Sequence, residues 1–279
     1  MPSDATAPVA PARPRKQEGY FWSVYDALGA DLDPAVRIEA FAAGMHWFGV
    51  RAAGSVGFAM APRDSHDSPS RAGRIAGAPL VDIAPLARSW NFADAALGIA
   101  ALNSHYNRPD RVLGWAQAPF FVHQTGANAF ETLRPRLAGR RVAVVGHFRG
   151  LEELAKICQL TILERRPQPG DAPDPACEVV LPESDFVFIT ATTLINKTLP
   201  RLLQLCRGAF VTIVGPTTPL TPLWFELGVD MIAGLLIDDV PAVWAIVQEG
   251  GQHTFFDHGT RMIQIERSRG DDSWRKDLP

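Results

Sequence analysis

A polar segment at residues 190–198 combines the side chains most suited to hold a small anion. It contains four threonines, among them Thr190 and Thr193, and then Asn196 and Lys197. Hydroxyl and amide groups beside one ammonium suit a carboxylate or a phosphate. Lys197 could also stabilise negative charge or transfer a proton, so Lys197 and Asn196 are the candidate catalytic residues. The alternative is that the threonines cap the next helix and that the lysine is solvated.

A second candidate site lies around Gly146 and His147, which follow the apolar run 141–145. A glycine there allows a tight turn that brings backbone N–H groups to an anion. Glu164 comes 18 residues after Gly146, close to where dinucleotide-binding folds place the acid that holds a ribose hydroxyl. The spacing favours a nucleotide or nucleoside-containing ligand. Alternatively, Glu164 is an ordinary strand-end acid paired with a neighbouring arginine.

The glycine fingerprint of a dinucleotide site is incomplete. The pattern G-x-G-x-x-G requires a middle glycine that lets the backbone approach a pyrophosphate, and only Gly146 and Gly150 are present. An NAD-dependent dehydrogenase is therefore an alternative that the sequence disfavours.

A third candidate is the loop 215–219, which follows the β-branched run 210–214. Its prolines stiffen it and its threonines supply two hydroxyls. Loops at the carboxyl ends of strands carry the ligand in open α/β sheets; the alternative is a rigid turn. The expected cofactor-binding residues of the three turns are Gly146, His147, Glu164, Thr190, Thr193, Gly215, Pro216, Thr217 and Thr218.

Three asparagines are candidates for substrate binding from the opposite side of a cleft. Asn91 and Asn107 flank an Ala-rich segment, and Asn103 lies one helical turn before Asn107, on the same face. Ligand sites often form between domains, so these amides could face the three turns. The alternative is that Asn91 and Asn107 cap the helix.

The sequence offers little support for a metal centre, and we assign no metal ligands. Its three cysteines are far apart and form no C-x-x-C pair, which argues against a zinc site. The histidines at 253 and 258 lie in a late loop, and the acids at 226, 230 and 238 could gather around a hard cation or serve as caps and ion pairs. Nucleophile-elbow and P-loop patterns are missing.

The elements that must position these residues divide the chain in two. An amphipathic helix from Tyr20 to Gly29 precedes three short strands at 36–43, 45–52 and 55–61, a polar surface loop at 62–79, and helices at 79–89 and 92–106, which indicates a small α+β domain. From 128 onward, strands alternate with helices, which predicts a parallel sheet, with a last strand at 261–266 on its edge. The whole is therefore an α/β protein.

Composition excludes several classes of protein. The chain has 279 residues, 47% of them hydrophobic, and a net charge of −3. No apolar run is long enough for a membrane helix, no Sec-type signal opens the chain, and no basic stripe suggests nucleic acid. We expect a cytoplasmic protein with no membrane or nucleic-acid partner. Trp115, Phe120 and Phe121 could form a homodimer surface or belong to the core between the domains.

The segments 215–222 (GPTTPLTP) and 226–230 (ELGVD) resemble the signature of a bacterial and archaeal family labelled "putative heavy-metal chelation domain", whose function is unknown. Further segments that fit this family are 145–148, 163–165 and 192–198, and those that look like its companion N-terminal domain are 89–91 and 97–103. The resemblance implies a Rossmann-like domain preceded by an enolase N-terminal-like domain. We expect a disordered tail at 1–18, the smaller domain at 19–110, the Rossmann-like domain at 111–268 and a loose tail at 269–279.

Together these features predict a protein that binds a small anionic or nucleotide-like metabolite in the cleft between its domains. An enzyme of metallophore or cofactor metabolism would be compatible with the family label. The alternatives are a non-catalytic metal- or metallophore-binding protein and an NAD-dependent dehydrogenase. Neither the reaction nor a cofactor can be named from the residues.

Overall fold

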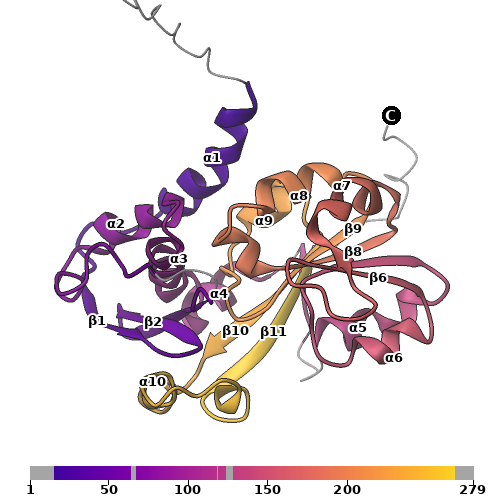
Figure 1. The fold of residues 1–279 in the computed structure, drawn as a ribbon. Helices are drawn as coiled ribbons and strands as arrows, with labels where there is room; N and C mark the ends of the chain where they lie inside the picture. The colour runs from indigo at the N-terminus through magenta and orange to yellow at the C-terminus, as the bar shows by residue number, and fades with distance from the viewer. Residues whose placement is uncertain (1–15, 64–66, 118, 124–127, 268–279) are drawn as a thin grey trace, which may run out of the picture.

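The computed structural model describes residues 16–63, 67–117, 119–123 and 128–267. A small lobe and a large sheet lie side by side, with helix α1 (Lys16–Gly29) between them at one end (Figure 1). The predicted tail is wrong for residues 16–18, which begin α1; the rest of that tail, and the C-terminal tail, lie outside the described residues.

The small lobe is an antiparallel meander backed by a helix, as the sequence predicted. Its strands are β1 (Ile38–Ala43), β2 (Trp47–Ala52) and β3 (Ser55–Met60), in that order. Helix α3 (Phe92–Tyr106) packs directly against β3. The two backbones are so close at Gly57 that a Cβ there would stand 2.0 Å from the backbone N of Ser104. This close approach explains why β3 carries a glycine there.

The helix predicted at 79–89 is instead two short pieces, α2 (Leu80–Ile83) and the 3₁₀ turn η1 (Ala84–Arg88). Pro85 is the physical reason: it has no backbone N–H to continue an α-helical ladder, and it occupies the first turn of η1.

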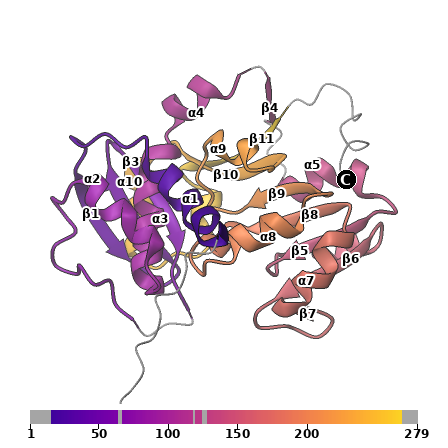
Figure 2. The same ribbon diagram turned by 90° about the horizontal axis from the view of Figure 1, so that it is seen from above.

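The large sheet has eight strands in the order β4-β11-β10-β9-β8-β5-β6-β7 (Figure 2). Strands from β10 to β7 in this order run parallel. The chain adds β6 on one side of β5 and then β8 on the other side, so the order of strand addition reverses between β5 and β8. This position is the switch point of a doubly wound sheet. The strand bounds are β5 (Arg141–Val145), β6 (Gln159–Glu164), β7 (Ala172–Pro173), β8 (Phe186–Thr190), β9 (Phe210–Val214) and β10 (Met231–Ile237).

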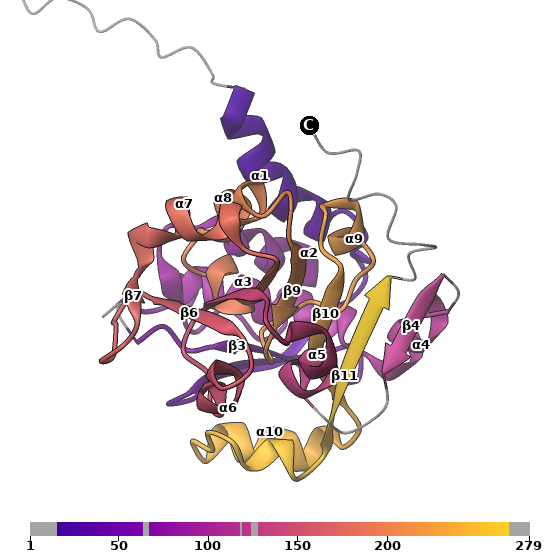
Figure 3. The same ribbon diagram turned by 90° about the vertical axis from the view of Figure 1, so that its right-hand side faces the viewer.

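The last strand, β11 (Thr260–Arg267), does not lie on the sheet edge, so that expectation is wrong. It pairs antiparallel with β10 and, on its other side, with β4 (Phe120–His123), which covers it (Figure 3). Strand β4 and helix α4 (Pro109–Trp115) fall in a stretch for which the sequence predicted only a connection. Nearby, Trp115 and Phe120 pack with Phe225, while Phe121 is 63% exposed.

Helices cover both faces of the parallel strands, and side chains alternate accordingly. Val142 and Val144 of β5 pack towards α5 (Ala129–Leu137) and α6 (Leu151–Ala155), whereas Ala143 packs in the core on the other face. The remaining helices are α7 (Cys177–Val180), α8 (Leu199–Leu205), α9 (Leu223–Glu226) and α10 (Val240–Gln248), with short 3₁₀ turns η2 (Asp174–Ala176), η3 (Leu181–Glu183), η4 (Ala191–Leu194) and η5 (Thr254–Phe256). Pro222 is the N-cap of helix α9.

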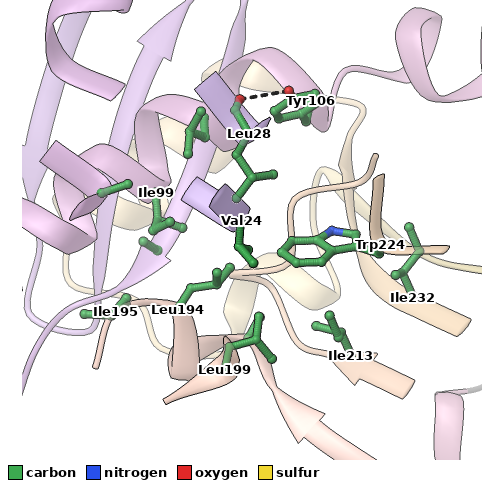
Figure 4. Close-up of a cluster of buried hydrophobic side chains, with 14 of the residues drawn as sticks. Val24, Leu28, Ile99, Tyr106, Leu194, Ile195, Leu199, Ile213, Trp224 and Ile232 are labelled. Carbon is green, nitrogen blue, oxygen red and sulfur yellow. Dashed lines mark hydrogen bonds between the residues drawn. The ribbon is translucent and has the colours of Figure 1, made fainter. Parts of the chain in front are cut away.

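One apolar core runs through both lobes. Val24 and Leu28 of α1, Leu194 and Ile195 after β8, and Trp224 of α9 meet in it (Figure 4). A separate cluster places α10 on the small lobe, with its Trp244 and Val243 grouped with Phe58 of β3. The lobes therefore share buried surface. Among the described residues, none of the helices has the length and apolar character of a membrane span.

Candidate functional site

The predicted turns after β5, β6, β8 and β9 lie on one rim. These four strands are parallel, so their carboxyl ends share an edge of the sheet. The switch point between β5 and β8 falls within that edge. The rim is where an open sheet of this kind leaves room for a ligand.

Gly146 brings the turn after β5 against β8. Its φ of +103° is a conformation that residues with a side chain rarely adopt. A Cβ at this position would stand 2.9 Å from Cγ2 of Thr190, at the end of β8. The backbone therefore approaches Thr190 closely because residue 146 is a glycine.

Glu164 ties together the turns after β5 and β6. Its Oε2 accepts a hydrogen bond of 3.0 Å from the backbone N–H of His147, and its Oε1 accepts from the backbone N–H groups of Arg165 (2.7 Å) and Arg166 (3.3 Å). A carboxylate has about four acceptor positions, so these three bonds leave room for one more donor, such as a ribose hydroxyl. The side chain is half-buried.

His147 is held by a residue that the sequence analysis missed. Its Nδ1 lies 3.0 Å from Oδ2 of Asp171, which also accepts from the backbone N–H of Gln168. Because a carboxylate oxygen can only accept, Nδ1 donates, and Nε2 is the nitrogen left for a ligand. The Asp171 side chain is 2% exposed. It follows a polar Pro-Gly stretch, a composition that does not indicate a buried acid.

The threonines after β8 form local caps. Thr190 Oγ1 lies 3.0 Å from Thr192 Oγ1 and caps η4 by accepting from the Thr192 backbone N–H. Thr193 is buried, and its hydroxyl donates to the Thr190 carbonyl at 2.6 Å. Asn196 Oδ1 accepts from the backbone N–H and the hydroxyl of Thr198, immediately before α8. Thr190 remains half-buried at the rim.

Lys197 is buried and adopts a left-handed backbone conformation, with φ of +68°. Its Nζ donates to the carbonyls of Ile195 (2.9 Å) and Leu194 (3.4 Å), and lies 5.3 Å from the ring centroid of Tyr25. Burial lowers the pKa of Lys197 to about 7. A neutral amine has two N–H donors, which is as many as the carbonyls that it contacts.

Asn103 and Asn107 contact the loop 215–219, and both amides are buried there against Thr217 and Thr218. Asn103 Nδ2 donates to the Thr217 carbonyl (3.0 Å) and to that of Phe58 (2.6 Å). Asn107 Nδ2 donates to the Thr218 carbonyl (2.9 Å), and its Oδ1 accepts from the backbone N–H of Leu220 (2.8 Å). The two amides therefore connect the lobes.

The remaining predicted residues divide between the rim and distant positions. Gly215 and Pro216 are half-buried at the rim side of their loop. Asn91 caps the other end of α3 by accepting from the backbone N–H groups of Ala93 and Asp94. The helix between Asn91 and Asn107 is about 22 Å long at 1.5 Å per residue, so Asn91 does not join the other two amides.

The described residues contain no group of three or more His, Cys, Asp or Glu placed to hold a metal ion. The cysteines are free; burial raises the pKa of Cys177 and of Cys206 to about 12, so neither is a ready thiolate.

A cavity of about 370 Å³ lies on the small lobe beside Ser70, Arg71 and Arg74. None of the predicted residues lines this hollow, so it is separate from the predicted site.

Two family models match the chain, and both are described as "Putative heavy-metal chelation". One, DUF364, covers residues 128–265, and the other, DUF4213, covers residues 25–106. A crystal structure from the DUF364 family, from Desulfitobacterium hafniense DCB-2, is 34% identical and has a TM-score of 0.81 over 88% of this chain and 98% of its own. The chain belongs to the DUF364 family.

Two further proteins are similar to this chain. A DUF364 structure from Pyrococcus horikoshii shares the fold, with a TM-score of 0.71 at 18% identity over 90% of this chain and 99% of its own. An uncharacterised protein of Methanocaldococcus jannaschii is 30% identical over 189 residues, which are 65% of this chain and 69% of that protein. Both solved DUF364 structures are described as having unknown function.

Proposed function

We propose that this DUF364 protein binds a small anionic, nucleotide-like metabolite at the rim formed by the ends of β5, β6 and β8. The observation that carries the proposal is the bond of Glu164 to the His147 backbone, which joins two strand-end turns beside the switch point. A carboxylate with one open acceptor position suits a sugar hydroxyl, and an oriented imidazole suits an anion or a proton transfer.

The ligand position that we favour is the open rim, not the buried junction between the lobes. The amide N–H groups of Asn103 and Asn107 donate to the carbonyls of Thr217 and Thr218. Gly146, Glu164 and Thr190, by contrast, keep partial exposure. Two buried oxygens at the junction, Asn103 Oδ1 and Thr218 Oγ1, have no hydrogen-bond partner among the described residues.

Catalytic roles for Lys197 and Asn196 require a further assumption. Lys197 donates to its own loop and is covered by Tyr25 of α1. A reaction at its amine would require α1 to move. If the protein is an enzyme of metallophore or cofactor metabolism, His147 is the better placed group for proton transfer, because Asp171 orients its ring.

A ligand screen by thermal unfolding tests the proposal, because a ligand that binds only the folded state raises its stability. The probes are AMP, ADP, NAD, S-adenosylmethionine, free amino acids and divalent metals. We expect a nucleotide-type probe to raise the Tm, and Glu164→Gln to abolish that rise. The matched control is Glu183→Gln, an exposed acid next to Asp185 at the amino end of the parallel strands. If no nucleotide-type probe shifts the wild-type Tm, the proposal fails.

A second candidate function is metal or metallophore binding without catalysis. His147 donates from Nδ1 to Asp171, an arrangement common for histidines that bind a metal through Nε2. The protein would then carry transition metal through purification and lose it in His147→Ala. Elemental analysis that finds only trace metal, with no rise in Tm on adding Zn²⁺ or Ni²⁺, would exclude this candidate.

A further inference from the structure

An exposed turn on the small lobe presents two arginines and a serine to one hollow. The hollow has a volume of about 370 Å³ and is lined by Ser70, Arg71 and Arg74. These residues belong to the connection between β3 and α2, for which the sequence predicted only a polar surface loop. The segment 68–79 contains both arginines and no acidic residue, so its own charge is positive.

Two successive turns set the spacing of the lining residues. The backbone N–H of Arg74 donates to the Arg71 carbonyl at 2.9 Å, which makes them the first and last residues of a β-turn, with Cα atoms within about 7 Å of each other. Gly73 is the third residue of this turn, where its φ of +79° suits a type II turn. The turn before it is closed by a bond of 3.0 Å from the backbone N–H of Ala72 to the Pro69 carbonyl. The two guanidinium groups are therefore carried by one hydrogen-bonded unit.

Contacts at both ends attach this unit to the body of the small lobe. At one end, the buried Asp94 of α3 accepts a hydrogen bond of 2.8 Å from the backbone N–H of Ser70, and Asn91 Nδ2 donates to the Ser68 carbonyl at 3.2 Å. At the other end, Ile75 is buried in the apolar core. Asn91, which does not reach the rim, thus helps to hold the loop that lines the hollow.

We propose that this hollow binds the phosphate group of a small molecule. A phosphate monoester carries a charge of about −1.5 to −2 at pH 7, which matches the two positive charges of Arg71 and Arg74. Each guanidinium can donate two parallel hydrogen bonds to phosphate oxygens, and the Ser70 hydroxyl is a further donor. A carboxylate offers fewer oxygens and a single charge, so it fits this donor set less well.

The inference goes beyond the proposed function, because the residues that line the hollow are not those of the rim. The hollow lies in the lobe matched by the DUF4213 model, whereas the rim lies in the part matched by DUF364. Sites for small molecules have volumes of about 300–1,000 Å³, so the hollow has room for more of a ligand than its phosphate group. The protein would then bind two ligands, one in each lobe.

Glycerol 3-phosphate is a suitable probe, because it is a phosphate monoester without a base or a ribose. In an amide NMR titration, we expect it to bind with millimolar affinity and to shift the backbone amides of Ser70, Arg71 and Arg74. Arg71→Gln and Arg74→Gln should each weaken binding about tenfold, since each removes a charged hydrogen-bond partner. The matched control is Arg140→Gln, an exposed arginine just before β5 in the other lobe, which should bind as the wild type does.

Three results would overturn the inference. The first is the absence of shifts in the turn at about 10 mM glycerol 3-phosphate. The second is equal weakening by Arg140→Gln and Arg71→Gln, which would show that the probe responds only to the overall charge of the protein. The third is tighter binding of succinate than of glycerol 3-phosphate, which would show that the hollow selects carboxylates.

Failure of this inference can be distinguished from failure of the nucleotide proposal. Glu164→Gln should leave the affinity for glycerol 3-phosphate within about twofold of the wild type, because the two sites share no residue. Loss of glycerol 3-phosphate binding in Glu164→Gln would place the phosphate at the rim and overturn the inference. Retained binding, together with an absence of ADP shifts at the rim, would support the hollow and refute the nucleotide proposal.

Discussion

The carboxylate of Glu164 accepts a 3.0 Å hydrogen bond from the backbone N–H of His147, which is 17 residues earlier in the chain. The bond fixes the turn after β5 to the end of β6, and Gly146 brings the same turn against β8. Three strand ends therefore form one rigid rim. Contacts at this rim and at the junction of the lobes can each be tested by a single substitution.

Replacing Gly146 by alanine should destabilise the protein by about 2–3 kcal/mol, because positive φ and a clash with Thr190 both oppose a Cβ there. Gly170→Ala is the control: its φ is +99°, but a Cβ at that position would meet no atom within 4 Å. Urea unfolding measures both. Equal losses in the two variants would show that the contact with Thr190 has no energetic role.

Removing the Asn107 side chain should weaken the junction between the lobes. Asn107→Ala leaves the Thr218 carbonyl and the Leu220 N–H buried without that partner, which should cost about 2–5 kcal/mol. Asn91→Ala, which removes a helix cap and an exposed hydrogen bond to the Ser68 carbonyl, should cost about 1 kcal/mol. A smaller loss for Asn107→Ala than for Asn91→Ala in urea unfolding would contradict this role.

Lys197 should make stability depend on pH in an unusual direction for a lysine. Its pKa falls from 10.5 to about 7 on folding, so between these values the unfolded chain holds a proton that the folded chain does not. Stability conferred by Lys197 is then lost as the pH falls from about 10 towards 7. Relative to Lys197→Met, the wild type should become more stable as the pH rises across this window.

Parallel stability curves for the wild type and Lys197→Met between about pH 7 and 9.5 would show that the lysine is charged when buried. The substitution suits this comparison because methionine has a similar length and no charge. The Leu194 carbonyl also keeps a partner in the variant, since it accepts a hydrogen bond from the Tyr25 hydroxyl.

Local signals in the sequence were sufficient for many elements of the fold. Asn128 followed by Glu131 forms the capping box that opens α5, and the apolar period placed α3 at 92–106, where it lies. Such features depend on residues within one helical turn of each other. The alternation of strands and helices in the same way predicted the parallel sheet.

Features that depend on distant contacts were missed. Strand β4 has four residues, and its partner β11 lies more than a hundred residues later. The apolar face of α10 was visible in the sequence, but not its packing on the small lobe. Likewise, the contact of Asp171 with His147 follows from the paths of two loops, which periodicity does not report.

An amide NMR titration of the full chain with ADP is the decisive experiment for a ligand site at the rim. We predict that the backbone amides of Gly146, His147, Arg165 and Thr192 shift together and saturate with one affinity, and that Glu164→Gln abolishes these shifts while Glu183→Gln keeps them. Shifts that are absent at the rim, or confined to the hollow beside Arg71 and Arg74, would contradict a ligand site at the ends of β5, β6 and β8.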